Sequence, residues 1–414
     1  MSVDDYDILV IGGGLAGASL AAALADSDVR IGLVEAVPPE APTQPSYDDR
    51  GIALAYGSRQ IFAGIGVWPY VDAVAEPIRR IQVSDRGGFG AMRMDCDELG
   101  FDALGYVALA RDLGRALMER IGQAPAIELI TPATLVGFSE SPDEVRVEID
   151  VSGQQRMLTC RLLVGADGMR SEVRRMAGIE VERHGYGQTA VIANVTPELR
   201  HDGVAFERFT VNGPLALLPL TPERCSLVWT HPDTETDSIL ALDDAPFLER
   251  LQEAFGYRLG RFQRVGERQS YPLNLVRARQ YIQGRIALVG NAAHTLHPVA
   301  GQGFNLGLRD VAVLAEGIDL ARRQGDDIGA SSVLNTYAQR RRGDLTRTSE
   351  LTDSLVRIFS NDYLPITLVR DLGLVGMDLC APFRHGFMYR TMGLGGEAPR
   401  LLRGVPLAGA SGRT

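Results

Sequence analysis

The chain has 414 residues, 45% of them hydrophobic and 23% charged, and a formal net charge of −10. These values predict a globular protein with a sizeable core and give no electrostatic support for a nucleic-acid partner. All 42 basic residues are arginine, which excludes chemistry that needs a lysine, such as a Schiff base or a Walker-type phosphate loop.

The four cysteines lie far apart, and no C-x-x-C pair is present. This spacing argues against a disulfide framework or a structural zinc site, so no metal is expected. The first residues lack the pattern of a signal peptide, and no apolar run reaches the length of a spanning helix. We therefore expect a cytoplasmic protein, either free or peripheral at the inner membrane.

The first predicted elements are a strand over residues 8–11, a helix-forming run over 18–25, and a second strand in "RIGLVEA". Glycines between the first strand and the helix have the spacing G-x-G-x-x-G, which is strong evidence for dinucleotide binding only in such a context. Glu35, at the end of the second strand, is expected to accept hydrogen bonds from ribose hydroxyls. This unit does not distinguish NAD from FAD. Its candidate cofactor-binding residues are Gly12, Gly14, Leu15, Ala16, Gly17 and Glu35.

Each glycine of this motif has its own expected role. Gly12 allows a tight turn, Gly14 lets a pyrophosphate approach the backbone, and Gly17 lets the helix pack closely on the strand. The amino end of the helix would then hold the negative charge of the phosphates.

Two later segments repeat the order strand, small-residue loop, helix. The first is "RLLVGADGMRSEVRRMAG", in which Ser171 is predicted to cap the helix. The second is "GRIALVGNAAHTLHPVAGQGFNLGLRDV". Ligands of open α/β sheets bind at the carboxyl ends of strands, so both loops are candidate cofactor contacts.

These three motifs, in this order, resemble the FAD-dependent aromatic hydroxylases built like para-hydroxybenzoate hydroxylase. Within that family the chain is most similar to the ubiquinone-biosynthesis branch, in particular the 2-octaprenyl-6-methoxyphenol hydroxylases. The resemblance runs from about residue 5 to about residue 395. It rests also on "DDRGIALAYGSRQIFAGIGVW", "AVIANV", "AFERFTVNGPLALLPL", "RCSLVWTHP" and "GQGFNLGLRDV".

The resemblance implies an α/β fold with a Rossmann-like, mixed parallel FAD-binding sheet, a smaller substrate sheet and a C-terminal helical region. FAD binding is expected in residues 1–75, 100–180 and 276–340. The substrate sheet is expected in residues 76–99 and 181–275. Helices are expected over 341–400, followed by a flexible tail over 401–414.

For the cofactor site, the resemblance places the "GQG" segment against the flavin ring, where the positive end of the following helix would favour the reduced flavin. Arg50 and Arg111 match positions near the flavin and the phosphates. Asn291 stands where the family carries an aspartate, which leaves the role of a carboxylate there open. The candidates added in this way are Arg50, Arg111, Asp167, Gly168, Asn291, Gly301, Gln302, Gly303 and Asn305.

The implied reaction is ring hydroxylation. NAD(P)H reduces FAD, dioxygen adds to give a C4a-hydroperoxide, and a lipophilic phenol is attacked. The expected substrate is a 2-polyprenyl-6-methoxyphenol hydroxylated para to its hydroxyl. Another ring position in the same pathway, and a flavin reductase that inserts no oxygen, stay open as alternatives, as does an FAD-bound scaffold. Only one G-x-G-x-x-G follows a strand, so NAD(P)H would visit the flavin without its own Rossmann domain.

Residues 181–275 predict short strands with turns at Asn212-Gly213 and Thr221-Pro222. Their apolar side chains are expected to form a pocket for a prenylated phenol or an ordinary core. His294 and His297 are the candidates for a proton relay, or are structural. The predicted pocket residues are Phe206, Phe209, Leu217, Leu218 and Pro298. The predicted catalytic residues of the flavin loop are His297, Pro298, Gly301 and Gln302.

Near the C-terminus, an apolar stripe repeats at helical spacing. Two alternatives stay open for it: packing on the domain, or contact with a membrane or with a ubiquinone-biosynthesis protein complex. The stripe consists of Leu368, Val369, Leu372, Val375 and Leu379.

Overall fold

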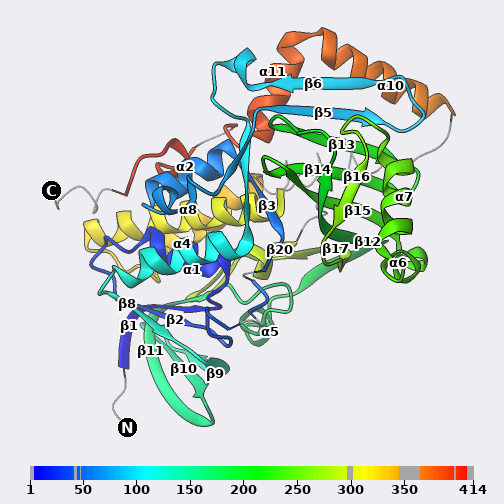
Figure 1. Ribbon diagram of the computed structural model, residues 1–414. Coiled ribbons are helices and arrows are strands. Elements are labelled where there is room, and N and C mark those ends of the chain that lie inside the picture. The colour runs from blue at the N-terminus through cyan, green and yellow to red at the C-terminus, as the bar shows by residue number, and fades with distance from the viewer. Residues whose placement is uncertain are drawn as a thin grey trace.

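The computed structural model describes residues 4–41, 44–46, 48–295, 302–344, 364–395 and 398–407. In these ranges the chain forms an eight-stranded mixed sheet, a nine-stranded sheet and a small three-stranded sheet, with helices packed around them (Figure 1). The predicted fold class is confirmed: an α/β architecture with a parallel nucleotide-type sheet, a separate, mainly antiparallel sheet and C-terminal helices.

The first sheet has the order β18-β19-β11-β1-β2-β8, and β10 and β9 extend it beside β11. Its central strands are parallel and are covered on both faces, as the apolar run at residues 8–11 predicts. Three separate parts of the chain therefore build one sheet. Its strands are β1 (Asp4–Ile11), β2 (Ile31–Val34), β8 (Ile127–Ile130), β9 (Ala133–Glu140), β10 (Val145–Val151), β11 (Gln154–Gly165), β18 (Ile282–Gln283) and β19 (Ile286–Leu288).

Helices α1, α4 and α8 lie together on one face of this sheet (Figure 1). Helix α1 is buried along most of its length because its side chains are almost all small or apolar. Ser171 caps α5 as predicted, since its hydroxyl accepts a hydrogen bond of 3.0 Å from the Arg174 backbone N–H. The helices of this part are α1 (Leu15–Ala23), α2 (Tyr56–Gly64), α3 (Trp68–Val71), α4 (Ala110–Gly122), α5 (Glu172–Met176), α8 (Gln302–Gln324) and the 3-10 turn η2 (Gly290–Ala292).

The second sheet has the order β20-β17-β12-β15-β14-β13-β5-β6, with β16 paired to β12. Successive side chains along its strands point to opposite faces of the sheet. One face packs on α7 in an apolar core, and the other face lies on the side of the first sheet. Its elements are β5 (Arg80–Asp85), β6 (Ala91–Asp95), β12 (Val181–Pro197), β13 (Val204–Thr210), β14 (Gly213–Thr221), β15 (Arg224–Pro232), α6 (Asp233–Leu240), α7 (Asp244–Phe255), β16 (Phe262–Val265), β17 (Gln269–Ala278) and β20 (His294–Thr295).

The third sheet, with the order β3-β7-β4, connects the two larger ones. Its middle strand pairs antiparallel with both neighbours. Asn194 on β12 donates a hydrogen bond of 3.2 Å to the Asp49 carbonyl just before β3, which ties this sheet to the second one. The strands are β3 (Gly51–Ala55), β4 (Glu76–Ile78) and β7 (Gly105–Leu109), and the 3-10 turn η1 (Cys96–Leu99) precedes β7.

Two C-terminal helices, α10 (Leu364–Leu379) and α11 (Ala381–Thr391), form a layer beside β5 and β6 (Figure 1). In the apolar stripe predicted here, Leu372 and Leu379 are 55% and 80% exposed and Val375 is half-buried. Leu374, which is not part of the predicted stripe, is buried. The side chains of Leu368 and Val369 lie outside the description. No helix in the described ranges combines the length and the apolar character needed to cross a bilayer.

The expectation of a flexible tail from residue 401 needs correction for residues 401–407. The 3-10 turn η4 (Leu401–Arg403) packs on α2, and Leu401 and Leu402 are buried in the core of the first sheet. A Cβ on Gly57 or Gly64 of α2 would come within about 3 Å of these two leucines, so the small residues of α2 form the groove that receives them. This segment is ordered because its apolar side chains are buried in the groove of α2.

Candidate functional site

A cavity of about 1550 Å³ runs between the carboxyl ends of β1 and β11, the third sheet, the inner face of the second sheet and the two C-terminal helices. One end is lined by the glycine turn after β1 and by the polar loops that follow β2 and β11. The other end is lined mainly by apolar side chains. The cavity therefore joins a nucleotide-type site to an apolar chamber.

The turn after β1 leaves no room for side chains. Gly12 has φ +104°, and a Cβ there would lie 2.6 Å from the Ala166 carbonyl oxygen. A Cβ on Gly17 would overlap the carbonyl oxygen of Gly12, which accounts for the close helix–strand packing. Gly14, Leu15 and Ala16 line the cavity, so a ligand at this turn would meet backbone rather than side chains.

Glu35 lies at the end of β2 and lines the cavity. Its carboxylate accepts hydrogen bonds from the backbone N–H groups of Gly13, at 2.6 Å, and Val37, at 2.9 Å. These bonds fix the carboxylate beside the glycine turn. A carboxylate has about four lone-pair positions, so acceptor capacity remains for hydroxyl groups of a ligand.

Asp167 and Gly168 of the second motif also line the cavity. One oxygen of Asp167, Oδ2, accepts hydrogen bonds from the backbone N–H groups of Glu172 and Val173, at 2.7 and 3.1 Å. The other oxygen, Oδ1, is buried and has no hydrogen-bond partner among the described residues. A buried acceptor without a partner is costly, so this atom fits a hydroxyl donor from a bound ligand.

The third motif is held by a buried cluster that the sequence did not reveal. The carboxylate of Asp310 on α8 is fully buried and accepts hydrogen bonds from Gly290 N–H at 2.9 Å, His294 Nε2 at 2.7 Å and Arg341 Nε at 2.6 Å. Burial alone would raise the pKa of Asp310, but its charge and hydrogen-bond partners outweigh burial and lower it. His294 is thus engaged with Asp310 and does not line the cavity.

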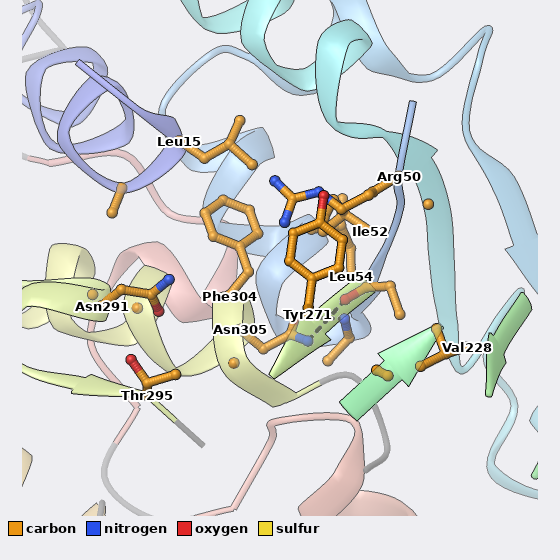
Figure 2. A pocket seen from close by; sticks show the side chains of 18 of the residues that line it. Leu15, Arg50, Ile52, Leu54, Val228, Tyr271, Asn291, Thr295, Phe304 and Asn305 are labelled. Atoms are coloured by element: carbon orange, nitrogen blue, oxygen red, sulfur yellow. Dashed lines mark hydrogen bonds between the residues drawn. The ribbon is translucent and has the colours of Figure 1, made fainter. Parts of the chain in front are cut away.

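A second buried arginine links two of the loops that line the cavity. Arg174 on α5 donates to the Met169 carbonyl at 2.8 Å and to the Ala292 carbonyl at 2.7 Å. It therefore fixes the loop after β11 to the turn after β19. Asn291 in that turn is exposed and faces the cavity (Figure 2). Arg174 is a positioning residue with no sequence motif to indicate it.

Helix α8 begins at Gln302, and its first turn lines the cavity with Gly303, Phe304 and Asn305 (Figure 2). Asn305 is buried, donates to the Ala53 carbonyl at 2.9 Å and accepts from Ala55 N–H at 2.8 Å. Its amide thus binds β3 to the helix start. The predicted residues His297, Pro298 and Gly301, and the side chain of Gln302, lie outside the described residues.

The two predicted arginines have different surroundings. Arg50 lines the cavity, bonds Asp48 through Nε at 2.8 Å, and stacks on Tyr271 at 4.8 Å from the ring centroid (Figure 2). Arg111 is 53% exposed, pairs with Asp49 at 2.5 Å and does not line the cavity. The geometry therefore favours a surface ion pair for Arg111 over a contact with the phosphates of a cofactor.

Of the predicted pocket residues, Phe209 and Leu218 line the apolar chamber. Phe206 borders the cavity, but its ring packs on Phe255 in the core on the α7 side, the core that also contains Leu217. Leu217 is corrected: it is fully buried in the core on the α7 side and does not line the cavity. The reason is strand alternation, because adjacent residues of β14 point to opposite faces. Pro298 lies outside the described residues. Sulfur-containing side chains that the sequence did not single out complete the wall: Met92, Met94, Met377 and Met392.

The cavity fits a flavin dinucleotide on three observations. The glycine turn admits only backbone contacts, Asp167 offers an unpartnered buried acceptor, and Arg50 brings a fixed cation to the same space. Glu35, Asp167, Asn291 and the first turn of α8 come from three distant parts of the sequence, yet all line one cavity. Such an arrangement can hold an extended cofactor whose far end reaches the apolar chamber.

Comparisons with known proteins agree with this geometry. A family model described as an FAD binding domain matches residues 5–350. The chain is 42% identical over 404 residues to the ubiquinone hydroxylase UbiL of Rhodospirillum rubrum, which covers 97% of this chain and 93% of that protein. It is 32% identical over 398 residues to the 3-demethoxyubiquinol 3-hydroxylase of Escherichia coli, covering 95% of this chain and 100% of that protein.

Among solved structures, p-nitrophenol 4-monooxygenase PnpA from Pseudomonas putida superposes with a TM-score of 0.80. The match covers 96% of this chain and 100% of that chain at 18% sequence identity. At this identity the likeness concerns the fold, and it extends over both large sheets and the C-terminal helices.

Proposed function

Since the chain belongs to the FAD-dependent aromatic hydroxylases, in their ubiquinone-hydroxylase branch, we propose that it hydroxylates the ring of a prenylated ubiquinone precursor. The specific proposal is a 2-polyprenyl-6-methoxyphenol, hydroxylated at the carbon para to its hydroxyl group. NAD(P)H is the proposed reductant and dioxygen the co-substrate. The proposal covers the substrate and the ring position, because the family itself supplies the enzyme class.

One observation carries the proposal: the nucleotide-type site opens into an apolar chamber within the same cavity. The chamber wall includes Ile81, Val83, Met94, Leu374 and Phe387. A phenol with an anionic substituent would lose hydration there without gaining a counter-ion, because nothing basic in the described residues lines this end. A prenylated methoxyphenol gains free energy from burial in the same space.

When bound, FAD supplies the hydride acceptor, the activation of dioxygen and the oxygen transfer. The residues of the chain provide the other requirements. The Asp310 cluster and Arg174 hold the turn at Gly290, and Asn305 holds the start of α8 against β3. The second sheet and the C-terminal helices enclose the chamber and exclude water from the reacting ring.

A second ring position is the competing proposal, because one relative is named a 3-demethoxyubiquinol 3-hydroxylase. The two reactions can be distinguished directly. The FAD-loaded protein is incubated with NAD(P)H, heavy-isotope dioxygen and 2-methoxy-6-prenylphenol, and the product is analysed by mass and NMR. One heavy oxygen para to the hydroxyl supports the first proposal. Incorporation elsewhere supports its rival, and oxidation of NAD(P)H without labelled product contradicts both.

We also propose that the C-terminal helices provide the route by which a lipophilic substrate leaves the bilayer. Their inner side lines the chamber through Leu374, Met377 and Phe387, while Leu379 and Phe383 are 80% and 74% exposed. A surface of this kind favours an apolar phase. Co-sedimentation with phosphatidylcholine vesicles tests the proposal. The double substitution Leu379→Glu with Phe383→Glu should weaken binding to the vesicles. Val211→Glu should not weaken it, because Val211 is an exposed residue of the second-sheet hairpin, outside these helices.

A further inference from the structure

One carboxyl group stands on the wall of the apolar chamber, and no motif accounts for it. Glu207 on β13 lines the cavity and is the only carboxyl group that the described part of the second sheet contributes to it. It pairs in register with Ala216 on β14 and with Val83 on β5, and both of these residues also line the cavity. The row continues across the sheet through Val228 and Ile192. Glu207 is thus an isolated acid in an apolar face.

The immediate surroundings of Glu207 contain no charge partner. No hydrogen bond or ion pair to its carboxyl group is found within the described ranges. Its neighbours in sequence do not change this, because Arg208 points to the opposite face of the sheet. On the same face, Asp85 lies beyond Phe209 and does not line the cavity. The other ionisable lining residues belong to the cofactor end or to β17: Glu35, Arg50, Asp167, Arg170, Glu172 and Tyr271.

The ionisation of Glu207 reflects this setting. The side chain keeps some accessible surface because it borders the cavity, but protein atoms surround it, and burial raises its pKa from 4.5 to about 7. An ordinary carboxylate is a poor base for a phenol of pKa about 10, and the raised pKa brings the two groups nearer. The small side chain of Ala216 beside the carboxyl leaves space for a ring.

We propose that Glu207 is a catalytic residue that binds the substrate's phenol hydroxyl and accepts its proton. This inference rests on the proposed phenol hydroxylation and names the group that would orient the ring. The Glu207 carboxylate accepts a hydrogen bond from the phenol O–H. The incoming oxygen would come from dioxygen that FAD, reduced by NAD(P)H, activates; its O–O bond breaks, and the second oxygen leaves as water. As the ring's para carbon forms its bond to this oxygen, the phenol proton passes to Glu207 and the phenol C–O bond becomes a carbonyl. Loss of the proton on the para carbon then restores the aromatic ring, and Glu207 returns its proton to the phenolic oxygen.

The test compares wild type, Glu207→Gln and Glu207→Asp, each loaded with FAD, with Glu182→Gln on the exposed part of β12 as a matched control. The probe is 2-methoxy-6-prenylphenol, titrated without NAD(P)H from pH 6 to pH 8.5 and followed by the change in flavin absorbance. In wild type, the ionised carboxylate accepts the hydrogen bond from the phenol more strongly than the neutral acid does, so Kd should fall roughly tenfold as pH rises through about 7. Glu207→Gln should bind more weakly at pH 8.5 and show no such pH dependence.

The outcomes distinguish the role of Glu207 from the proposed reaction. Glu207→Asp should retain a pH dependence and Glu182→Gln should match wild type, while FAD content measured by absorbance shows that each variant is folded. A Glu207→Gln variant with the wild-type pH profile of Kd would overturn the role of Glu207, even if wild type forms labelled product. If Glu207→Gln loses the pH dependence of Kd but the wild type forms no labelled product, the role of Glu207 in binding stands and the proposed reaction is contradicted. Absence of probe binding to wild type would contradict both.

Discussion

Replacement of Asp310 by asparagine should destabilise the protein through the turn at Gly290, which lines the cavity. Asparagine keeps the shape but removes the charge opposite Arg341, whose side chain is 2% exposed. Its NH₂ must also face a donor, either Arg341 or the pair Gly290 and His294. Removing one partner of a buried ion pair costs about 3–5 kcal/mol. Asp344 still contacts Arg341 at 2.5 Å, so the lower end, about 3 kcal/mol, is expected.

Urea unfolding followed by circular dichroism measures this loss, and flavin fluorescence reports release of FAD in the same samples. Asp319→Asn is the matched control, because Asp319 is also a buried acid of α8, and in the described ranges its one ion pair is with the partly exposed Arg323. The control should cost less than about 1 kcal/mol. Equal losses for the two variants would refute the assignment of a special role to the Asp310 cluster.

The pH dependence of this loss has a definite sign. The pKa of Asp310 is lowered in the folded protein, so its stabilising contribution is complete above its ordinary value near 3.8 and is lost as pH falls through the lower, folded value. The difference between wild type and Asp310→Asn should therefore stay constant from pH 5 to pH 8. It should shrink only in acid below about pH 4.

Four further changes have expected outcomes. Gly17→Ala, whose Cβ would overlap the Gly12 carbonyl, should abolish retention of FAD through gel filtration. Arg50→Met should weaken FAD binding, measured by fluorescence, by about 1.5–3 kcal/mol, which is tenfold or more. Glu207→Gln should stabilise the protein in urea at pH 8 by up to about 3 kcal/mol and not at pH 4, because burial raises the Glu207 pKa from 4.5 to about 7 and penalises its ionised form. Only Cys380 should react with a thiol reagent before unfolding, because the other three thiols are buried: Cys96, Cys160 and Cys225.

The sequence predicted well those parts of the fold whose signals are local. The glycine spacing before α1, the hairpin turn predicted at Asn212-Gly213 and the Ser171 cap each depend on a few adjacent residues. The structure contains all three, with the hairpin turn one residue earlier, at Val211-Asn212. The division of the chain into segments that return to the same sheet came from the family resemblance. Local patterns carry no information about which strands pair across more than a hundred residues.

The parts that sequence reasoning missed depend on which face a side chain takes. Glu207 and Arg208 are adjacent polar residues of one strand, and nothing local says that the first borders a chamber. Leu217 and Leu218 are equally apolar, yet only Leu218 lines the cavity. The Asp310–Arg341 pair joins residues 31 positions apart, and Arg174 bridges two loops through backbone carbonyls, which any residue possesses.

The burial of η4 in the groove of α2 has a consequence for the order of synthesis. Leu401 and Leu402 complete the same core that β1 begins, so the nucleotide-binding half cannot reach its final packing until nearly the whole chain has left the ribosome. The glycine turn after β1 is thus synthesised early, and its supporting core is completed late. A chain truncated before residue 401 would leave the groove along Gly57 and Gly64 open to water in an otherwise assembled domain.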